Sequence, residues 1–124
     1  MIFLQLNSNM VNFTKMGSVL TWEIENLQFP NKDIALSSFV INFSRKVDIG
    51  YLQIATNLIQ QNTYNPDGIL YCSVFHNNRD RLSIAPPNYE FWKIDIKYPR
   101  LIKIQLDNIN IDLVTFTSIT LVIN

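Results

Sequence analysis

The sequence predicts an all-β protein, an antiparallel β-sandwich of about eight strands with a jelly-roll or similar Greek-key topology. Apolar residues recur at every second position in several separate runs, as in strands that bury one face. Isoleucine, valine, threonine and aromatic residues, which strands favour, are abundant. Short groups of turn-forming residues separate the runs. The 124 residues suit one domain, and we expect a single β-sandwich domain over residues 1–124.

Five runs alternate most regularly and are expected to turn their apolar side chains toward the core. Polar or charged residues occupy most of the positions between them. Trp92 belongs to one of these runs, and we expect it to lie between the two sheets. The apolar members are Ile2, Leu4 and Leu6; Leu20, Trp22 and Ile24; Trp92, Ile94 and Ile96; Ile102, Ile104 and Leu106; and Ile119, Leu121 and Ile123.

The run from Ile34 to Phe43 changes phase in its middle. Apolar residues stand at even positions up to Leu36 and at odd positions from Phe39, so the change falls at Ser37-Ser38. One extra residue in a strand, a β-bulge, produces this change and bends the strand. We therefore predict a bulge here, in a strand that passes from one sheet of the sandwich to the other.

Two further segments have less regular patterns. Tyr51–Gln60 fits either a helix or a strand, and we favour a strand because no capping residue opens the segment. The helical face would comprise Leu52, Ala55, Thr56 and Ile59, and the strand face Leu52, Ile54, Thr56 and Leu58. Ile69–Phe75 is apolar with little alternation, which predicts a strand buried on both faces.

Groups of turn formers mark where the strands end. The predicted turns are Pro30–Asp33, Asn65–Gly68, His76–Asp80, Pro86–Asn88 and Asp107-Asn108. Three loops rich in Asn, Tyr and Arg would then lie at one end of the sandwich. These loops are Asn62–Gly68, His76–Arg81 and Ala85–Glu90.

Charge and composition argue against several classes of protein. Ten basic residues balance ten acidic ones, so electrostatics gives no reason to expect a dedicated nucleic-acid binder or a protein of anionic membranes. No apolar run has the roughly 18 residues of a membrane-spanning helix, and the N-terminus does not resemble a signal peptide. A single cysteine fits a reducing, intracellular compartment.

Few residues suggest chemistry. On a strand, Cys72 and His76 would stand roughly 13 Å apart, so we expect a buried structural thiol and an exposed loop histidine. Glu23 and Glu25 are expected to be solvent-facing charges and not a catalytic pair. The three glycines are scattered, so no phosphate-binding loop forms. We therefore expect no catalytic, cofactor-binding or metal-binding residue, and no enzyme.

Basic residues crowd one stretch of the sequence, and Trp92 and Tyr98 lie among them. They are Arg79, Arg81, Lys93, Lys97, Arg100 and Lys103. Acidic residues dilute the stretch, and alternation turns Trp92 inward, away from Lys93, so we do not expect a nucleic-acid surface.

Alternation also directs several apolar side chains outward, and two interpretations remain open. Either these residues form a contact surface, or another part of the chain covers them. They are Phe3, Val40, Val114 and Val122.

The succession of segments from Gly50 onward resembles the small β-sandwich proteins of Polinton/Maverick-type elements and related double-stranded DNA viruses. The matching segments are Gly50–Ile54, Ile69–Phe75, Pro87–Tyr89, Ile102–Asp107 and Ile119–Ile123, with Ile34–Phe39 upstream. The turn Asp107–Asn110 lacks the glycine usual in that family. The resemblance implies a single jelly-roll minor capsid protein of the penton type, located in the virion. It also implies a homo-oligomer, a trimer or pentamer, in contact with other capsid proteins. The alternative is a β-sandwich module that binds a glycan or protein receptor through its loops.

Overall fold

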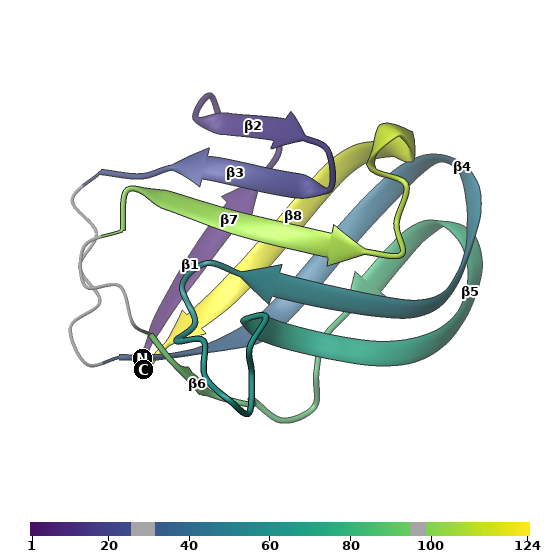
Figure 1. Cartoon of the computed structure of the whole chain (residues 1–124). Coiled ribbons are helices and arrows are strands. Elements are labelled where there is room, and N and C mark those ends of the chain that lie inside the picture. The colour runs from purple at the N-terminus through teal and green to yellow at the C-terminus, as the bar shows by residue number, and fades with distance from the viewer. Residues whose placement is uncertain (26–31, 95–98) are drawn as a thin grey trace.

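The computed structural model describes residues 1–25, 32–94 and 99–124, and nearly all of its regular structure is β-strand (Figure 1). The strands are β1 (Ile2–Asn7), β2 (Phe13–Met16), β3 (Val19–Glu23), β4 (Asp33–Thr56), β5 (Ile69–Ile84), β6 (Trp92–Lys93), β7 (Leu101–Asp107) and β8 (Val114–Ile123). A 3₁₀ turn, η1 (Ile111–Leu113), precedes β8. The predicted all-β, sandwich-like fold is confirmed.

Strand β4 belongs to two sheets. Its first half pairs with β8, which also pairs with β1. Its second half pairs with β7, which leads on to β3 and β2. Strand β5 runs antiparallel to β4 through both halves. The first sheet therefore has the order β1-β8-β4-β5 and the second β2-β3-β7-β4-β5, which is a jelly-roll arrangement of two facing sheets.

The predicted bulge in β4 is confirmed. Leu36 pairs with Leu121 and Ser38 with Thr120, so Ser37 is the extra residue. The bulge does not move the strand to the other sheet, however, because pairing with β8 continues as far as Phe43. The passage between sheets comes later, where the register of β4 with β5 shifts between Asn42 and Val47. Figure 1 shows β4 and β5 bending together around that end of the sandwich.

Most of the residues predicted to point inward form the core. Leu20, Trp22 and Leu121 are among the fully buried side chains. The indole Nε1 of Trp22 donates a hydrogen bond to the carbonyl of Asn7 (2.9 Å). Since Trp22 lies in the second sheet and Asn7 ends β1 in the first, this bond joins the sheets across the core.

Four of the predicted inward residues are less buried than expected, and one of them is Leu4 of β1, which is partly buried. Ile2, near the start of β1, is 58% exposed, and Ile24 is only partly buried. Trp92 is half-buried against the edge of the core, because it lies in β6, a two-residue strand that pairs with the first two residues of β4. Ile96 lies outside the described residues.

Tyr51–Gln60 follows the strand interpretation as far as Thr56. Leu52, Ile54 and Thr56 are buried on one face, and a turn then carries the chain to Ile59, which bridges to Ile94. The favoured prediction is therefore confirmed for the part that continues β4.

Two predictions for β5 are wrong. Ile69–Phe75 is not buried on both faces, because the outer face of β5 is uncovered and Val74 is 72% exposed. His76–Asp80 is not a turn, and His76–Arg81 is not a loop, because these residues continue β5 alongside β4 around the bend. Local turn propensity there is overridden by strand pairing.

Three of the remaining predicted turns are confirmed. Asn65–Gly68 and Pro86–Asn88 lie in loops, and Asn108 takes a left-handed conformation (φ 67°) directly after β7. Of Pro30–Asp33, the first two residues lie outside the described residues, and Asp33 begins β4.

The outward apolar residues divide between the two interpretations. Phe3 is 54% exposed, and Val40 and Val114 are partly exposed. Val122 is fully buried, as is Ala35 beside it on β4, so this part of the outer face is covered.

We predict that Trp22→Ala lowers the free energy of unfolding by about 3–5 kcal/mol, as expected for a large aromatic residue in a packed core. Urea unfolding followed by circular dichroism measures this loss. Trp92→Ala is the matched control, and its loss should be smaller because Trp92 is only half-buried. Equal losses in the two variants would contradict the placement of Trp22 at the centre of the core.

Candidate functional site

A groove of about 180 Å³ lies on the outer face of the second sheet. Its floor comes from β3, β7 and the end of β4, and its wall comes from the loop between β4 and β5. The lining residues are Val19, Ala55, Thr56, Asn57, Gln61, Asp67, Lys103 and Gln105. The groove is a candidate ligand site.

Asn57 attaches the start of the loop to β7. Its side-chain Nδ2 donates to the Leu101 carbonyl (2.9 Å), and its Oδ1 accepts from the Lys103 amide (2.9 Å). The side chain thus offers the same donor and acceptor pair as a peptide group in a strand. It extends the pairing of β7 beyond Thr56, where β4 ends.

Asn65 attaches the end of the loop in the same way. This side chain is only 3% exposed, and its Nδ2 donates to the Ile69 carbonyl (2.9 Å) while its Oδ1 accepts from the Ile69 amide (2.8 Å). Asn62 supports the turn, because its Oδ1 accepts from the amides of Tyr64 and Asn65.

Gly68 closes the loop in a conformation that other residues adopt poorly. Its φ is +66°, and a Cβ atom there would lie 2.8 Å from the Thr56 carbonyl oxygen. Its own carbonyl accepts a hydrogen bond from the Thr56 amide (3.0 Å). The two ends of the loop are therefore held together, and the wall of the groove is fixed in place.

The groove combines small apolar floor residues with polar side chains. Val19 and Ala55 contribute the apolar part. Two amides, Gln61 and Gln105, stand with the Lys103 ammonium and the Asp67 carboxylate around it. The amide, ammonium and carboxylate groups among the lining residues can donate and accept hydrogen bonds.

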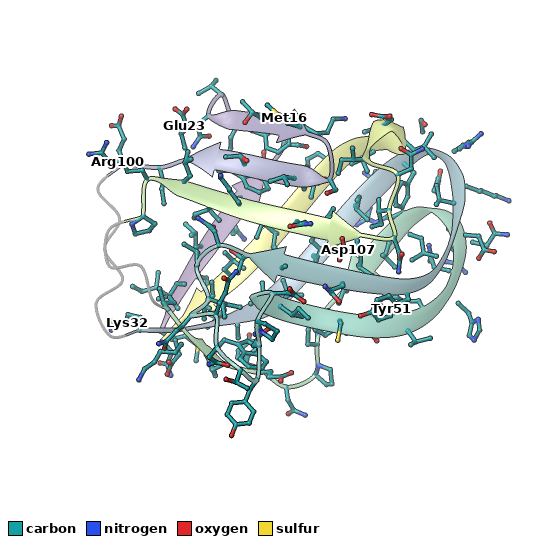
Figure 2. The ribbon with its side chains drawn as sticks, viewed as in Figure 1. Met16, Glu23, Lys32, Tyr51, Arg100 and Asp107 are labelled. Carbon is teal, nitrogen blue, oxygen red and sulfur yellow. The ribbon has the colours of Figure 1, made fainter. Side chains whose placement is uncertain are left out.

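A second polar cluster lies on the same sheet, where β4 meets β7 and β5. The Tyr51 hydroxyl donates to Gln53 Oε1 (3.0 Å), and Gln53 Nε2 donates to Asp107 Oδ2 (3.1 Å). Figure 2 labels Tyr51 and Asp107 at this end of the second sheet. Cys72 pairs with Gln53 across β4 and β5.

This cluster contains the one cysteine, and the expectation of a buried thiol is wrong. Cys72 is exposed, because it lies on the uncovered outer face of β5. Desolvation raises the pKa of the Tyr51 hydroxyl, and the Cys72 thiol and the Asp107 carboxylate raise this pKa further.

Glu23 and Glu25 are both exposed, as expected of solvent-facing charges. Figure 2 shows Glu23 at the end of β3, on the same side of the molecule as Arg100.

The basic residues that are close in sequence do not share one strand or sheet edge. Arg79 and Arg81 lie on the second half of β5, Lys93 on β6 beside Asp33, and Lys103 in the groove. Arg100 directly precedes β7, and Lys97 and Tyr98 lie outside the described residues.

Pairing of β4 with β5 instead gathers a different basic group, which sequence spacing could not show. Arg45 and Lys46 lie in the register shift of β4 opposite Arg79 and Arg81. Asp48 and Asp80 lie in the same bend, so the group carries charge of both signs.

Comparison with known proteins gives no relative by sequence: no protein-family model matches the chain, and no curated protein matches it. Among the described residues, no group of three or more His, Cys, Asp or Glu side chains is placed to hold a metal ion. Within the same residues, no helix has both the length and the hydropathy needed to cross a membrane.

We predict that Asn65→Asp destabilises the fold by about 1–3 kcal/mol, because the new carboxylate cannot donate to the Ile69 carbonyl. Urea unfolding at neutral pH measures the effect. Asn88→Asp, an exposed change in the loop before β6, is the matched control and should be close to neutral. Equal effects in the two variants would show that the Asn65 amide does not hold the loop.

We also predict that Cys72→Ser lowers the pKa of Tyr51. The Cys72 side chain is one of the causes of the raised Tyr51 pKa, through its charge and a hydrogen bond, and a serine at this position removes the charge. Ultraviolet absorbance titration measures the change, and the same titration of Tyr51→Phe identifies the Tyr51 contribution. An unchanged Tyr51 transition would show that the two side chains do not interact.

Proposed function

We propose that this chain is a non-enzymatic structural protein, a capsid- or vertex-like jelly-roll subunit that self-assembles into oligomers. The observation that carries the proposal is a concentration of exposed apolar side chains at the N-terminal end of the chain. Met1, Ile2 and Phe3, at the start of β1, are each more than half exposed, as are Val11 in the turn after β1 and Met16 on β2 of the other sheet. Exposed apolar clusters on folded proteins usually mark contact surfaces.

The charge pattern supports the same function. Residues 1–14 contain no charged side chain, and the whole chain has a formal net charge of zero. Charged residues are depleted at the centre of protein interfaces. The exposed apolar side chains at the start of β1 lie in a stretch without charged side chains and are therefore suited to contact with another protein.

The jelly-roll strand order also supports the proposal, since capsid proteins are among the classes that use this fold. Lectin domains use it too, so the fold alone does not select the function. The proposed assembly is a trimer or pentamer closed by repeated contacts between neighbouring subunits. Location in the virion, other capsid proteins as partners, and membership of the Polinton-type family are parts of this proposal.

The groove favours a second candidate function, a binding module for a glycan. Gln61, Asp67, Lys103 and Gln105 provide hydrogen-bond donors and acceptors at one site. The bonds made by Asn57 and Asn65 hold its wall in place before any ligand binds, and such preorganisation reduces the entropic cost of binding.

We predict that the purified chain forms a discrete oligomer whose population rises with protein concentration. Size-exclusion chromatography with light scattering, repeated at several concentrations and followed by negative-stain imaging, measures its mass and shape. A folded chain that stays monomeric at tens of micromolar would contradict the structural function. A glycan array would then test the binding module, with Asp67→Asn as the groove variant.

A further inference from the structure

Strand β1 has one open edge in the part of the chain that the structure describes. It pairs with β8 on one side, without a register shift, from Ile2 to Asn7. The Ser8 amide donates to the Thr117 carbonyl (2.9 Å) just beyond this pairing. Peptide groups of alternate residues face opposite sides of a strand. Even-numbered residues of β1 therefore direct their peptide groups to β8, and odd-numbered residues direct theirs to the open edge.

The open edge presents the peptide groups of Phe3 and Gln5. The next odd residue, Asn7, is already engaged, because its carbonyl accepts hydrogen bonds from Trp22 Nε1 and the Met10 amide. Both of these bonds confirm the assigned direction, since neither partner lies in β8. Phe3 and Gln5 thus offer two amide donors and two carbonyl acceptors to an incoming strand.

The other sheet edges carry charges that discourage pairing, whereas β1 carries none. Strand β5 is an edge along its length and bears Arg79, Asp80 and Arg81. Strand β2 has four residues, and one of them is Lys15. Proteins use such charges and short strands to prevent edge-to-edge association. Their absence from residues 1–14 leaves β1 as the edge open to pairing.

We propose that β1 pairs antiparallel with β1 of a second copy of this chain, about a two-fold axis at Leu4. In this register Phe3 lies opposite Gln5 of the other copy, and the two pairs exchange four main-chain hydrogen bonds. The contact joins the first sheets of two copies into one continuous sheet. It is isologous, so it closes after two copies and is distinct from the ring contact. This inference rests on the proposed self-assembly and names one contact through which it occurs.

A second copy is the occupant that best fits this edge. The two-fold register satisfies all four free peptide groups with the same short segment. Because the segment is uncharged, two copies approach without the repulsion that charged edges such as β5 would produce. Phe3, more than half exposed, would lie beside the Gln5 side chain of the other copy.

A disulfide trap tests this register directly. In the proposed pairing the two Leu4 residues face each other as a non-hydrogen-bonded pair, with Cα atoms about 4.5 Å apart, within the range that a disulfide spans. We expect Leu4→Cys, in a Cys72→Ser background, to form a covalent dimer in a glutathione redox buffer. Thr14→Cys in the same background places a thiol on the β2 edge and is the matched control, which should stay reduced.

A second variant tests the hydrogen bonds without disturbing β8. Gln5→Pro removes an amide that faces the open edge, so the bonds between β1 and β8 are retained. We expect this variant to fold, as circular dichroism would show, and to form assemblies of half the wild-type mass by light scattering.

The outcomes separate this inference from the proposed function. A wild-type oligomer whose mass Gln5→Pro leaves unchanged, with no Leu4→Cys disulfide, would overturn the β1 contact and leave self-assembly standing. A monomeric wild type that still forms the Leu4→Cys disulfide would uphold the strand contact and overturn the stable assembly. Equal trapping of Leu4→Cys and Thr14→Cys would reject the specific register.

Discussion

The structure depends on the continuous pairing of β4 with β5 through both sheets. A 24-residue strand cannot stay in one flat sheet of a domain this small, so β4 bends, and β5 bends with it to keep its hydrogen bonds. The bend brings the two halves of β4 into different sheets, where β8 and β7 add to them. The core, the groove and the arrangement of edges all follow from this one pair of strands.

The shared strands also decide which surfaces remain open. Because β5 pairs with β4 alone, it is an edge of both sheets, and its outer face carries the exposed Cys72 and Val74. At the opposite edge of the first sheet lies β1, whose exposed side chains, Ile2, Phe3 and Gln5, are uncharged. The two edges of the first sheet thus differ in charge. This difference favours association through β1 over association through β5.

Alternation predicted the strands that bury one face and expose the other. It also predicted the Ser37 bulge, because an added residue moves every later side chain to the opposite face of the strand. Alternation could not predict the bend, because residues there such as Arg45 and Lys46 are all exposed and show no alternation of apolar and polar side chains. His76–Asp80 resembled a turn because its own residues favour turns. The strand it pairs with lies about thirty residues earlier, and local sequence patterns do not show such long-range pairing. The groove joins β3, β4, β7 and a loop, and neither Asn57 nor Asn65 differs by sequence from the other thirteen asparagines.

Asparagine side chains complete sheet edges that strands leave open. Where β4 ends, the amide of Asn57 supplies the donor and acceptor that β7 would otherwise present to water. Asn65 does the same at the start of β5. No side chain among the described residues supplies such a pair to Phe3 and Gln5 of β1, although Asn7 and Asn9 lie close in sequence. Asparagine side chains thus close the edges where β4 ends and β5 begins, whereas β1 stays uncharged and open. The β1 edge is therefore the one suited to pairing with another strand.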